Sequence, residues 1–362
     1  MRCTAVGLLT ACCIAACAAA GTSAATGYAP VVAGKPLSFP QDFGSHPEFR
    51  TEWWYVTGWL HTAERDPLGF QITFFRTRPP PPGQANPSAF SPEQILIAHC
   101  AISDPKRGRL WQDQKIRRSG FGLVDAKVGD TQVWIERWRL QHDGGDYAAT
   151  IEAADFSLGL RLHEVQPPLL NGDRGFSRKG PEPSAASYYY SIPHLRVSGT
   201  ISRNSRKETV QGEAWLDHEW SSEYLDDGAS GWDWFGLNLN DGSALMAFRI
   251  RARDGSTRWA GGTWRNAQGQ VEVFAPQSLR FEPKRSWSSP RTAIRYPIEW
   301  TLDAGTRRLQ VRPLLDDQEN DTRLSTGAIY WEGAVRAMDP AGLEIGRGYL
   351  ELTGYGAPLH LP

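Results

Sequence analysis

Strand-forming residues alternate most clearly in the stretch Glu52-Trp53-Trp54-Tyr55-Val56-Thr57-Gly58-Trp59-Leu60. Aromatic and β-branched side chains fit the pleated, half-buried surface of a sheet. Because successive side chains of a strand point to opposite faces, residues 53, 55 and 57 would share one face and residues 54, 56 and 58 the other. The stretch therefore predicts a β-strand with large aromatic residues on both faces.

Similar segments recur along the chain and are separated by turn residues such as Asn240-Asp241-Gly242 and Arg253-Asp254-Gly255. The predicted strands are residues 52–60, 69–76, 95–102, 132–140, 147–151, 157–163, 188–198, 212–218, 232–240, 244–251, 258–264, 271–274, 298–302, 309–311, 328–335 and 346–352. Antiparallel strands in such number must hide their edges, and about eight strands close one small barrel. We therefore expect an all-β fold of two consecutive antiparallel β-barrels, residues 26–224 and 225–362.

The composition excludes some classes of function. The chain has 362 residues, of which 40% are hydrophobic and 22% charged, with a formal net charge of -1. Such a chain can bury a core, and its near-neutral charge argues against a nucleic-acid binder. Fifteen Trp against 3 Met favour a protein that lines a cavity with aromatic surface.

Residues 1–25 have the features of an export signal, with Arg2 followed by a short apolar run. Two cleavage sites compete. Ile14-Ala15-Ala16-Cys17 matches a bacterial lipobox, in which Cys17 is lipidated, whereas Ser23-Ala24-Ala25 suits an ordinary signal peptidase. We expect an exported protein, either anchored in the periplasm through an N-terminal lipid or secreted. Cys100 is the one cysteine outside the leader, and its apolar surroundings predict a buried structural thiol.

The densest polar cluster is Glu213-Ala214-Trp215-Leu216-Asp217-His218-Glu219-Trp220-Ser221-Ser222. On a strand, Asp217 and Glu219 would face one side, and His218 and Trp220 the other. A buried histidine beside carboxylates is a usual acid–base arrangement, so Asp217, His218 and Glu219 are candidate catalytic residues. The alternative is a polar plug that seals a barrel end, with His218 hydrogen-bonded and inert.

Two further clusters could line a site. Trp232 and Trp234 would share one strand face, with Asp233 on the other, and could line an apolar pocket or belong to ordinary barrel core. Trp54 and Glu52 begin the first strand, where Glu52 and Arg50 could form a buried ion pair or cap a barrel.

Common catalytic motifs are absent from the sequence. There is no G-x-S-x-G, H-E-x-x-H, G-x-G-x-x-G or P-loop, and the eight His lack the paired spacing of a zinc site. We therefore expect neither a bound metal nor a cofactor. Ser221 or Ser222 with His218 stays open as a compressed nucleophile–base pair.

Three motifs in order resemble the CrtC/AttH-like lipocalin-related family, whose exported bacterial members are labelled predicted secreted hydrolases. They are residues 49–58 (FRTEWWYVTG), 214–222 (AWLDHEWSS) and 346–355 (GRGYLELTGY), and the resemblance extends from about Phe39 to Tyr355. It implies two consecutive lipocalin-like β-barrels, in agreement with the strand series.

The family also includes carotenoid 1,2-hydratases, which add water to an isoprenoid double bond without a cofactor. Their activity depends on a His-x-Trp pair, matched here by His218 and Trp220, and on a later Tyr-x-Asp pair. The second pair has no counterpart, because the corresponding strand reads Leu245-Met246-Ala247-Phe248-Arg249. An alkene is a weak base, so its protonation needs a positioned acid, and aromatic faces stabilise the resulting cation.

From the resemblance we expect a protein that binds or modifies an apolar isoprenoid- or lipid-like molecule. Asp217, His218 and Glu219 would supply acid–base chemistry, and the substrate would be held by Trp220, Trp232, Asp233, Trp234, Trp54 and Glu52. Two alternatives stay open. One is a non-catalytic lipid carrier associated with an ABC transporter, and the other is a secreted hydrolase.

Overall fold

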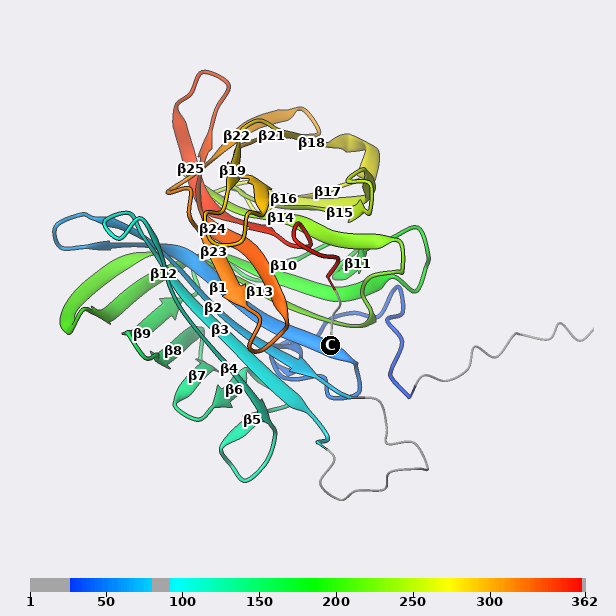
Figure 1. The fold of residues 1–362 in the computed structure, drawn as a ribbon. Coiled ribbons are helices and arrows are strands. Elements are labelled where there is room, and N and C mark those ends of the chain that lie inside the picture. The colour runs from blue at the N-terminus through cyan, green and yellow to red at the C-terminus, as the bar shows by residue number, and fades with distance from the viewer. Residues whose placement is uncertain (1–26, 80–91, 360–362) are drawn as a thin grey trace, which may run out of the picture.

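The computed structural model describes residues 27–79 and 92–359, and almost all of their regular structure is β-strand (Figure 1). The strands form two large antiparallel sheets, one from each half of the chain, stacked one above the other. The prediction of an all-β fold with two consecutive barrels is confirmed.

The first sheet is built from residues 51–223 and is called the first barrel, because β4 at one end of the sheet contacts β6 near the other end. Two short strands, β10 (Leu169–Leu170) and β11 (Phe176–Arg178), pair with β12 beside the main path. The main path runs through β4 (Arg109–Arg118), β3 (Ile95–Asp104), β2 (Pro67–Thr77), β1 (Thr51–Thr62), β13 (Arg206–Glu223), β12 (Ala186–Arg203), β9 (Phe156–His163), β8 (Asp146–Glu152), β7 (Trp138–Asp143), β6 (Gln132–Ile135) and β5 (Val124–Ala126).

The second sheet is built from residues 229–352 and is called the second barrel, because β16 and β18 meet and bring its two ends together. β23 (Glu319–Thr322) pairs with β24, and β19 (Ser286–Ser288) pairs with β20 (Arg295–Pro297) in a separate ribbon. The path runs through β17 (Val271–Phe274), β16 (Thr257–Arg265), β15 (Ala244–Ala252), β14 (Ala229–Leu239), β25 (Glu344–Leu352), β24 (Ala328–Met338), β22 (Arg307–Pro313), β21 (Trp300–Ala304) and β18 (Leu279–Pro283).

Side-chain alternation along the strands creates three apolar clusters. On β1, Trp54 and Val56 point into the first barrel, whereas Tyr55 and Trp59 point out of it. The outward residues meet a matching face of the second barrel that includes Trp234 from β14. Each barrel therefore has its own core, and a third cluster lies between the barrels, where β1 and β2 contact β25 and β24.

Two sequence predictions about strands differ from the structure. Residues 132–140 form two strands, β6 and β7, because the chain reverses at Glu136, which has a φ of 58°. The polar segment Arg109–Arg118 was not predicted as a strand, yet it forms the edge strand β4, whose register pairs Ile95 with Arg118. Charged side chains are common on edge strands, because they discourage pairing with other chains.

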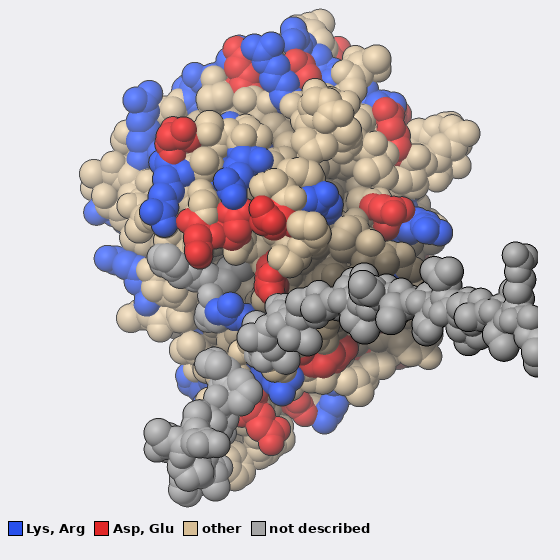
Figure 2. All heavy atoms as spheres, turned by 90° about the vertical axis from the view of Figure 1, so that its right-hand side faces the viewer, with Lys and Arg blue, Asp and Glu red and all other residues tan. Residues whose placement is uncertain are grey.

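Neither of the two 3₁₀ helices among the described residues is long enough to cross a membrane. The predicted export signal, including Cys17, and most of the Pro-rich segment at residues 79–92 lie outside the described residues. Cys100 is a buried free thiol, as expected. On the face shown in Figure 2, acidic and basic side chains lie interspersed.

Candidate functional site

Strand β13 separates the three adjacent ionisable residues into two environments. His218 and Trp220 point into the first barrel, where both are fully buried. Asp217 and Glu219 point toward the second barrel and are 2% and 3% exposed. The alternation therefore follows the sequence prediction, but the expected joint action of Asp217, His218 and Glu219 in one site does not fit this arrangement.

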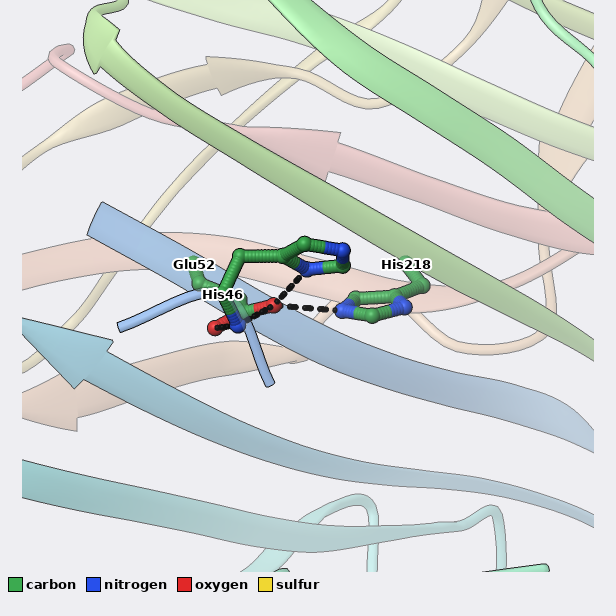
Figure 3. A group of neighbouring side chains, drawn as sticks. All are labelled: His46, Glu52 and His218. Atoms are coloured by element: carbon green, nitrogen blue, oxygen red, sulfur yellow. Dashed lines mark hydrogen bonds and ion pairs between the residues drawn. The ribbon is translucent and has the colours of Figure 1, made fainter. Parts of the chain in front are cut away.

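Inside the first barrel, Glu52 on β1 is the acceptor for two histidines (Figure 3). Its Oε1 lies 2.8 Å from His218 Nε2 and 2.8 Å from His46 Nδ1. Its Oε2 accepts a hydrogen bond from Arg76 Nε at 2.7 Å. The predicted ion pair between Glu52 and Arg50 is therefore wrong, because cross-strand pairing of β1 with β2 places Arg76 opposite Glu52.

Burial and neighbouring charges determine the protonation of Glu52 and the two histidines. Burial by itself would raise the pKa of Glu52, but the positive charges of Arg76 and His46 outweigh it and hold the pKa well below its usual range. Burial also opposes ionisation of His46, whose pKa is nevertheless raised by Glu52 and Asp42. The pKa of His218 is lowered by burial, against the hydrogen bond and charge of Glu52.

Aromatic rings close the space around these charges. The Trp54 ring stacks on His218 with centroids 4.6 Å apart, and the Trp220 ring stacks on His46 at 3.8 Å. The remaining nitrogen of His218, Nδ1, lies 3.0 Å from the Tyr190 hydroxyl. This arrangement corresponds to the polar plug, in which Trp54, Glu52 and Trp220 are fully buried inside the first barrel.

The plug also brings together three atoms that could ligate a metal. The ligand atoms of His46, Glu52 and His218 lie within 4.8 Å of one another. The guanidinium of Arg76 occupies the same carboxylate, however, and would repel a cation. Every ring nitrogen of the two histidines also has a protein partner. We therefore interpret the cluster as a structural network centred on Glu52, in which Arg76 Nη1 and Trp220 Nε1 are left without a hydrogen-bond partner among the described residues.

A second polar group lies between the barrels, in what we call the junction pocket. The free volume of this pocket is about 40 Å³, enough for a few water molecules. Its walls combine aromatic rings with buried carboxyls, a combination suited to orienting an apolar ligand with a few polar contacts. It is lined by Trp53, Tyr55, Thr73, Phe75, Tyr189, Asp217, Glu219, Tyr224, Trp232, Trp234, Tyr330, Glu332 and Glu351.

Asp217 is held by three donors. The Tyr189 hydroxyl donates to Oδ2 at 2.6 Å, while Ser191 Oγ and Trp215 Nε1 donate to Oδ1 at 2.5 and 2.6 Å. Trp234 Nε1 in turn donates to the Tyr189 hydroxyl at 2.9 Å. Burial raises the pKa of Asp217 to about 7, against these hydrogen bonds, so the carboxyl can change protonation near neutral pH.

Glu219 is paired with a lysine that the sequence did not indicate. Lys179 Nζ lies 2.7 Å from Glu219 Oε1, and the lysine side chain is 1% exposed. The ammonium sits over the Phe248 ring at 4.1 Å and the Tyr189 ring at 4.7 Å. Burial lowers the pKa of Lys179, against the charge of Glu219.

Lys179 directly follows β11, in the segment that connects β9 with β12. The short pairings of β10 and β11 with β12 hold this segment against the barrel and place Lys179 beneath the pocket. Nothing in the local sequence pattern indicates that this lysine is buried.

Two more carboxyls come from the second barrel and were also missed. Glu332 on β24 and Glu351 on β25 are cross-strand neighbours. Burial raises the pKa of Glu351 to about 7, against a hydrogen bond from Trp232 Nε1 at 2.7 Å. Burial and the charge of Glu351 raise the pKa of Glu332 well above its usual value. Glu351 lies in the third family-like motif, but only the packing of the barrels reveals its position.

The remaining predicted residues divide between two places. Trp232 and Trp234 line the junction pocket. Asp233 points into the second barrel, where it accepts hydrogen bonds from Arg249 Nε at 2.6 Å, Arg251 Nε at 3.1 Å and Tyr355 at 2.9 Å. Asp233 is fully buried and does not line the junction pocket, because it points to the opposite face of β14 from Trp232 and Trp234.

The serine–histidine pair does not form. Ser221 Oγ donates to the Ala186 carbonyl at 2.6 Å, and Ser222 Oγ donates to the Ala29 carbonyl at 2.6 Å. Both nitrogens of His218 have other partners. These two serines therefore lack the base that a nucleophilic hydrolase requires.

Comparison with known proteins places the chain in a family. A model of the AttH-like family matches residues 30–355. A crystal structure described as an AttH protein from Nitrosomonas europaea is 52% identical, with a TM-score of 0.85, and the match covers 90% of this chain and 99% of that one. No curated protein matches the chain.

More distant structures share the fold. Kievitone hydratase from Nectria haematococca has a TM-score of 0.67 at 14% identity, with 91% of this chain and 96% of that one covered. CghA, in a crystal structure with Sch210972, has a TM-score of 0.51 at 12% identity, covering 85% of this chain and 89% of that one.

Proposed function

The protein is a member of the AttH-like family, and from this we propose that it is a cofactor-independent, hydratase-type enzyme acting on an apolar, unsaturated molecule in the junction pocket. The observation that carries the proposal is the pair of carboxyls Asp217 and Glu351, whose pKa values are both raised to about 7 within one aromatic pocket. Acids and bases poised near the working pH are the most effective in proton transfer. The hydratase fold of kievitone hydratase agrees with this reading.

The surroundings of the two carboxyls suggest different roles. Three hydrogen bonds favour the ionised form of Asp217, whereas Glu351 accepts one from Trp232. Glu351 would therefore donate a proton to an alkene carbon, and Asp217 would take a proton from the attacking water. The alkene gains one hydrogen and one hydroxyl, and the proton on Asp217 returns to Glu351 through solvent.

The walls of the pocket match the charge that develops in such a reaction. Protonation of an alkene leaves a carbocation, and the faces of Trp and Tyr rings attract positive charge. Trp53, Trp232 and Trp234 lie in the lining of the pocket. The free volume of about 40 Å³ is well below that of a drug-sized ligand site, so the side chains of the lining must move apart to admit a substrate. We therefore expect a short isoprenoid chain to fit better than a full carotenoid.

The test is water addition in ¹⁸O-labelled water with geraniol, farnesol and farnesene as probes, followed by mass spectrometry. We expect a product heavier by one labelled water, and a loss of rate of about 10²–10⁴-fold in Asp217→Asn and Glu351→Gln. Glu213→Gln is the matched control, because Glu213 lies on β13 outside the pocket and is partly exposed. Absence of product with every probe would count against the proposal.

A lipid carrier is the competing function for the same pocket. The aromatic lining would serve binding without chemistry, and the absence of a serine–histidine pair in β13 argues against the hydrolase alternative. A carrier would retain its ligand unchanged, and the substitutions Asp217→Asn and Glu351→Gln would leave binding intact. Export, lipidation of Cys17 and association with an ABC transporter stay predictions from the sequence.

A further inference from the structure

Glu332 is a buried acid without a hydrogen-bond partner. Its side chain lines the junction pocket, and the residue is 3% exposed. Tyr55, Tyr330 and Asn320 lie near enough to moderate its pKa, but neither carboxylate oxygen accepts a hydrogen bond of normal geometry from any residue of the described ranges. Two of these neighbours are engaged with each other, because Asn320 Nδ2 donates to the Tyr330 hydroxyl at 3.0 Å. A buried carboxyl without a hydrogen-bond partner destabilises the folded protein unless it is protonated or a ligand supplies the missing interaction.

The hydroxyl of Tyr55 is a second buried polar group of this kind. It is buried and lines the same pocket, and among the described residues it has no hydrogen-bond partner of normal geometry. Tyr55 lies on β1 of the first barrel and Glu332 on β24 of the second. The two groups come from opposite barrels and lie near enough for each to shift the pKa of the other, so one small cationic group at the pocket could contact both.

The lining of the pocket is acidic and has no basic side chain to balance it. Its lining contains four carboxyls and neither lysine nor arginine. The nearest ammonium, Lys179, is committed to Glu219 at 2.7 Å and lies over the rings of Phe248 and Tyr189. The other three carboxyls, Asp217, Glu332 and Glu351, have no basic side chain in an ion pair within the described structure. The pocket therefore favours a positively charged ligand.

The aromatic part of the lining sets the kind of cation. Trp53, Phe75 and Trp232 border the pocket together with Glu332. A hydrated metal ion would gain nothing from such walls, whereas an alkylammonium combines an apolar body with a charge that both rings and carboxylates attract.

We infer that the junction pocket is a binding site for an apolar amine in its ammonium form, with Glu332 as the ion-pair partner and Tyr55 as a second contact. This site goes beyond the proposed hydration and does not depend on it. A stable ammonium would occupy the place where the reaction generates a transient cation, but it would bind whether or not the protein is an enzyme.

Binding of a cation should be linked to the protonation of Glu332. An uncharged Glu332 must lose its proton to pair with the ammonium, so affinity should rise with pH while the free site is protonated. The titratable and charged groups around Glu332 and its partner Glu351 are Tyr55, His99, Cys100, Lys179, Tyr189, Asp217, Glu219, Tyr224, Tyr330, Tyr349 and Glu351. Of these groups, Asp217 and Glu351 would also make the affinity for the amine rise with pH, because a bound cation favours their ionised forms.

The experiment compares citronellylamine with citronellol, its neutral counterpart, by isothermal titration calorimetry on the full chain. We expect the amine to bind at least tenfold more tightly than the alcohol at pH 8. The amine should release protons on binding and gain up to about tenfold in affinity per pH unit between pH 6 and pH 8. Glu332→Gln should weaken amine binding by at least tenfold and leave alcohol binding within about twofold.

Glu213→Gln is again the control and should match the wild type in both titrations. If Glu332→Gln does not fold, Tyr55→Phe and the pH series on the wild-type protein still decide the question. Equal affinity for amine and alcohol, or affinity for the amine that does not change with pH, would overturn the inference. Binding of calcium or magnesium chloride in place of the amine would also overturn it. Amine binding without hydration of any alkene would support the inference while removing the proposed function.

Discussion

Glu52 balances the charge inside the first barrel. It is fully buried and accepts hydrogen bonds from Arg76 Nε, His46 and His218. Removal of one partner from a buried ion pair leaves an uncompensated charge and costs about 3–5 kcal/mol. Glu52→Ala should therefore lower the free energy of unfolding by that amount, measured by urea denaturation.

A matched control tests whether the loss comes from the buried charge. Glu48 is exposed and lies four residues away, so Glu48→Ala should change the free energy of unfolding by less than about 0.5 kcal/mol. The double substitution Glu52→Leu with Arg76→Met removes both charges and should recover part of the loss. A loss below about 1 kcal/mol for Glu52→Ala would show that the network does not stabilise the barrel.

At the level of single residues, alternation is predictable but partners are not. The period of two along β13 is enough, from the sequence alone, to place His218 and Asp217 on opposite faces. It says nothing about which distant residue comes opposite. Glu332 and Lys179 lie more than a hundred and nearly forty residues from Asp217 in the sequence, and reach it only because the barrels and the β10–β11 segment pack there.

Close approach of the two barrels depends on Gly69 in β2. A Cβ at this position would lie 2.6 Å from Ala334 Cβ and 2.7 Å from the Tyr349 hydroxyl, both on the second barrel. Overpacking of this kind costs about 1–3 kcal/mol. Gly69→Ala should lower the free energy of unfolding by that amount and weaken binding in the junction pocket, as measured by urea denaturation and ligand titration.

Gly159 in β9 provides the comparison. A Cβ there would be 3.7 Å from Thr200 Oγ1, an ordinary contact, and Gly159 is exposed. Gly159→Ala should leave the stability unchanged or slightly increase it, because it reduces the freedom of the unfolded chain. Equal effects of the two substitutions would mean that the barrels are not in tight contact at Gly69.

The elements that were predictable are the long strands with apolar alternation, such as β1 and β12. Those that were not are of two kinds. β4 is polar and lies at an edge, so it lacks the apolar face that signals a strand. The others have two to five residues each, which is too short for alternation to show in the sequence; they are β5, β10, β11, β18, β19, β20 and β23.

The whole molecule should respond to pH mainly through the junction pocket. A pKa of Asp217 raised from 3.8 to about 7 means that the folded state binds more protons than the unfolded state between these values. Stability from this group is present at low pH and is lost as pH rises, by about 4 kcal/mol in order of magnitude. Glu351 acts in the same direction, and so does His46, whose pKa is raised.

Other groups act in the opposite direction, among them Glu52, His218 and His99, whose pKa burial lowers to about 3. The lowered pKa of Glu52 provides stability that is lost as pH falls below about 4.5. The lowered pKa of His218 means that acid favours unfolding below about 6.5. Because four junction carboxyls have a raised pKa and only His99 and His218 oppose them in this argument, the free energy of unfolding should be higher at pH 5.5 than at pH 8, with a shallower slope in Asp217→Asn. A free energy of unfolding that rises steadily from pH 5.5 to pH 8 would contradict this prediction.

In the proposed function, the chemistry occurs between the barrels, and His218 inside the first barrel has a structural role. The most direct test is deuterium uptake from D₂O into the carbon skeleton of farnesol, compared between Glu351→Gln and His218→Gln at equal folded fractions. We expect at least a hundredfold slower uptake in Glu351→Gln and a rate within about threefold of wild type in His218→Gln. Loss of uptake in His218→Gln with full uptake in Glu351→Gln would contradict the proposed function.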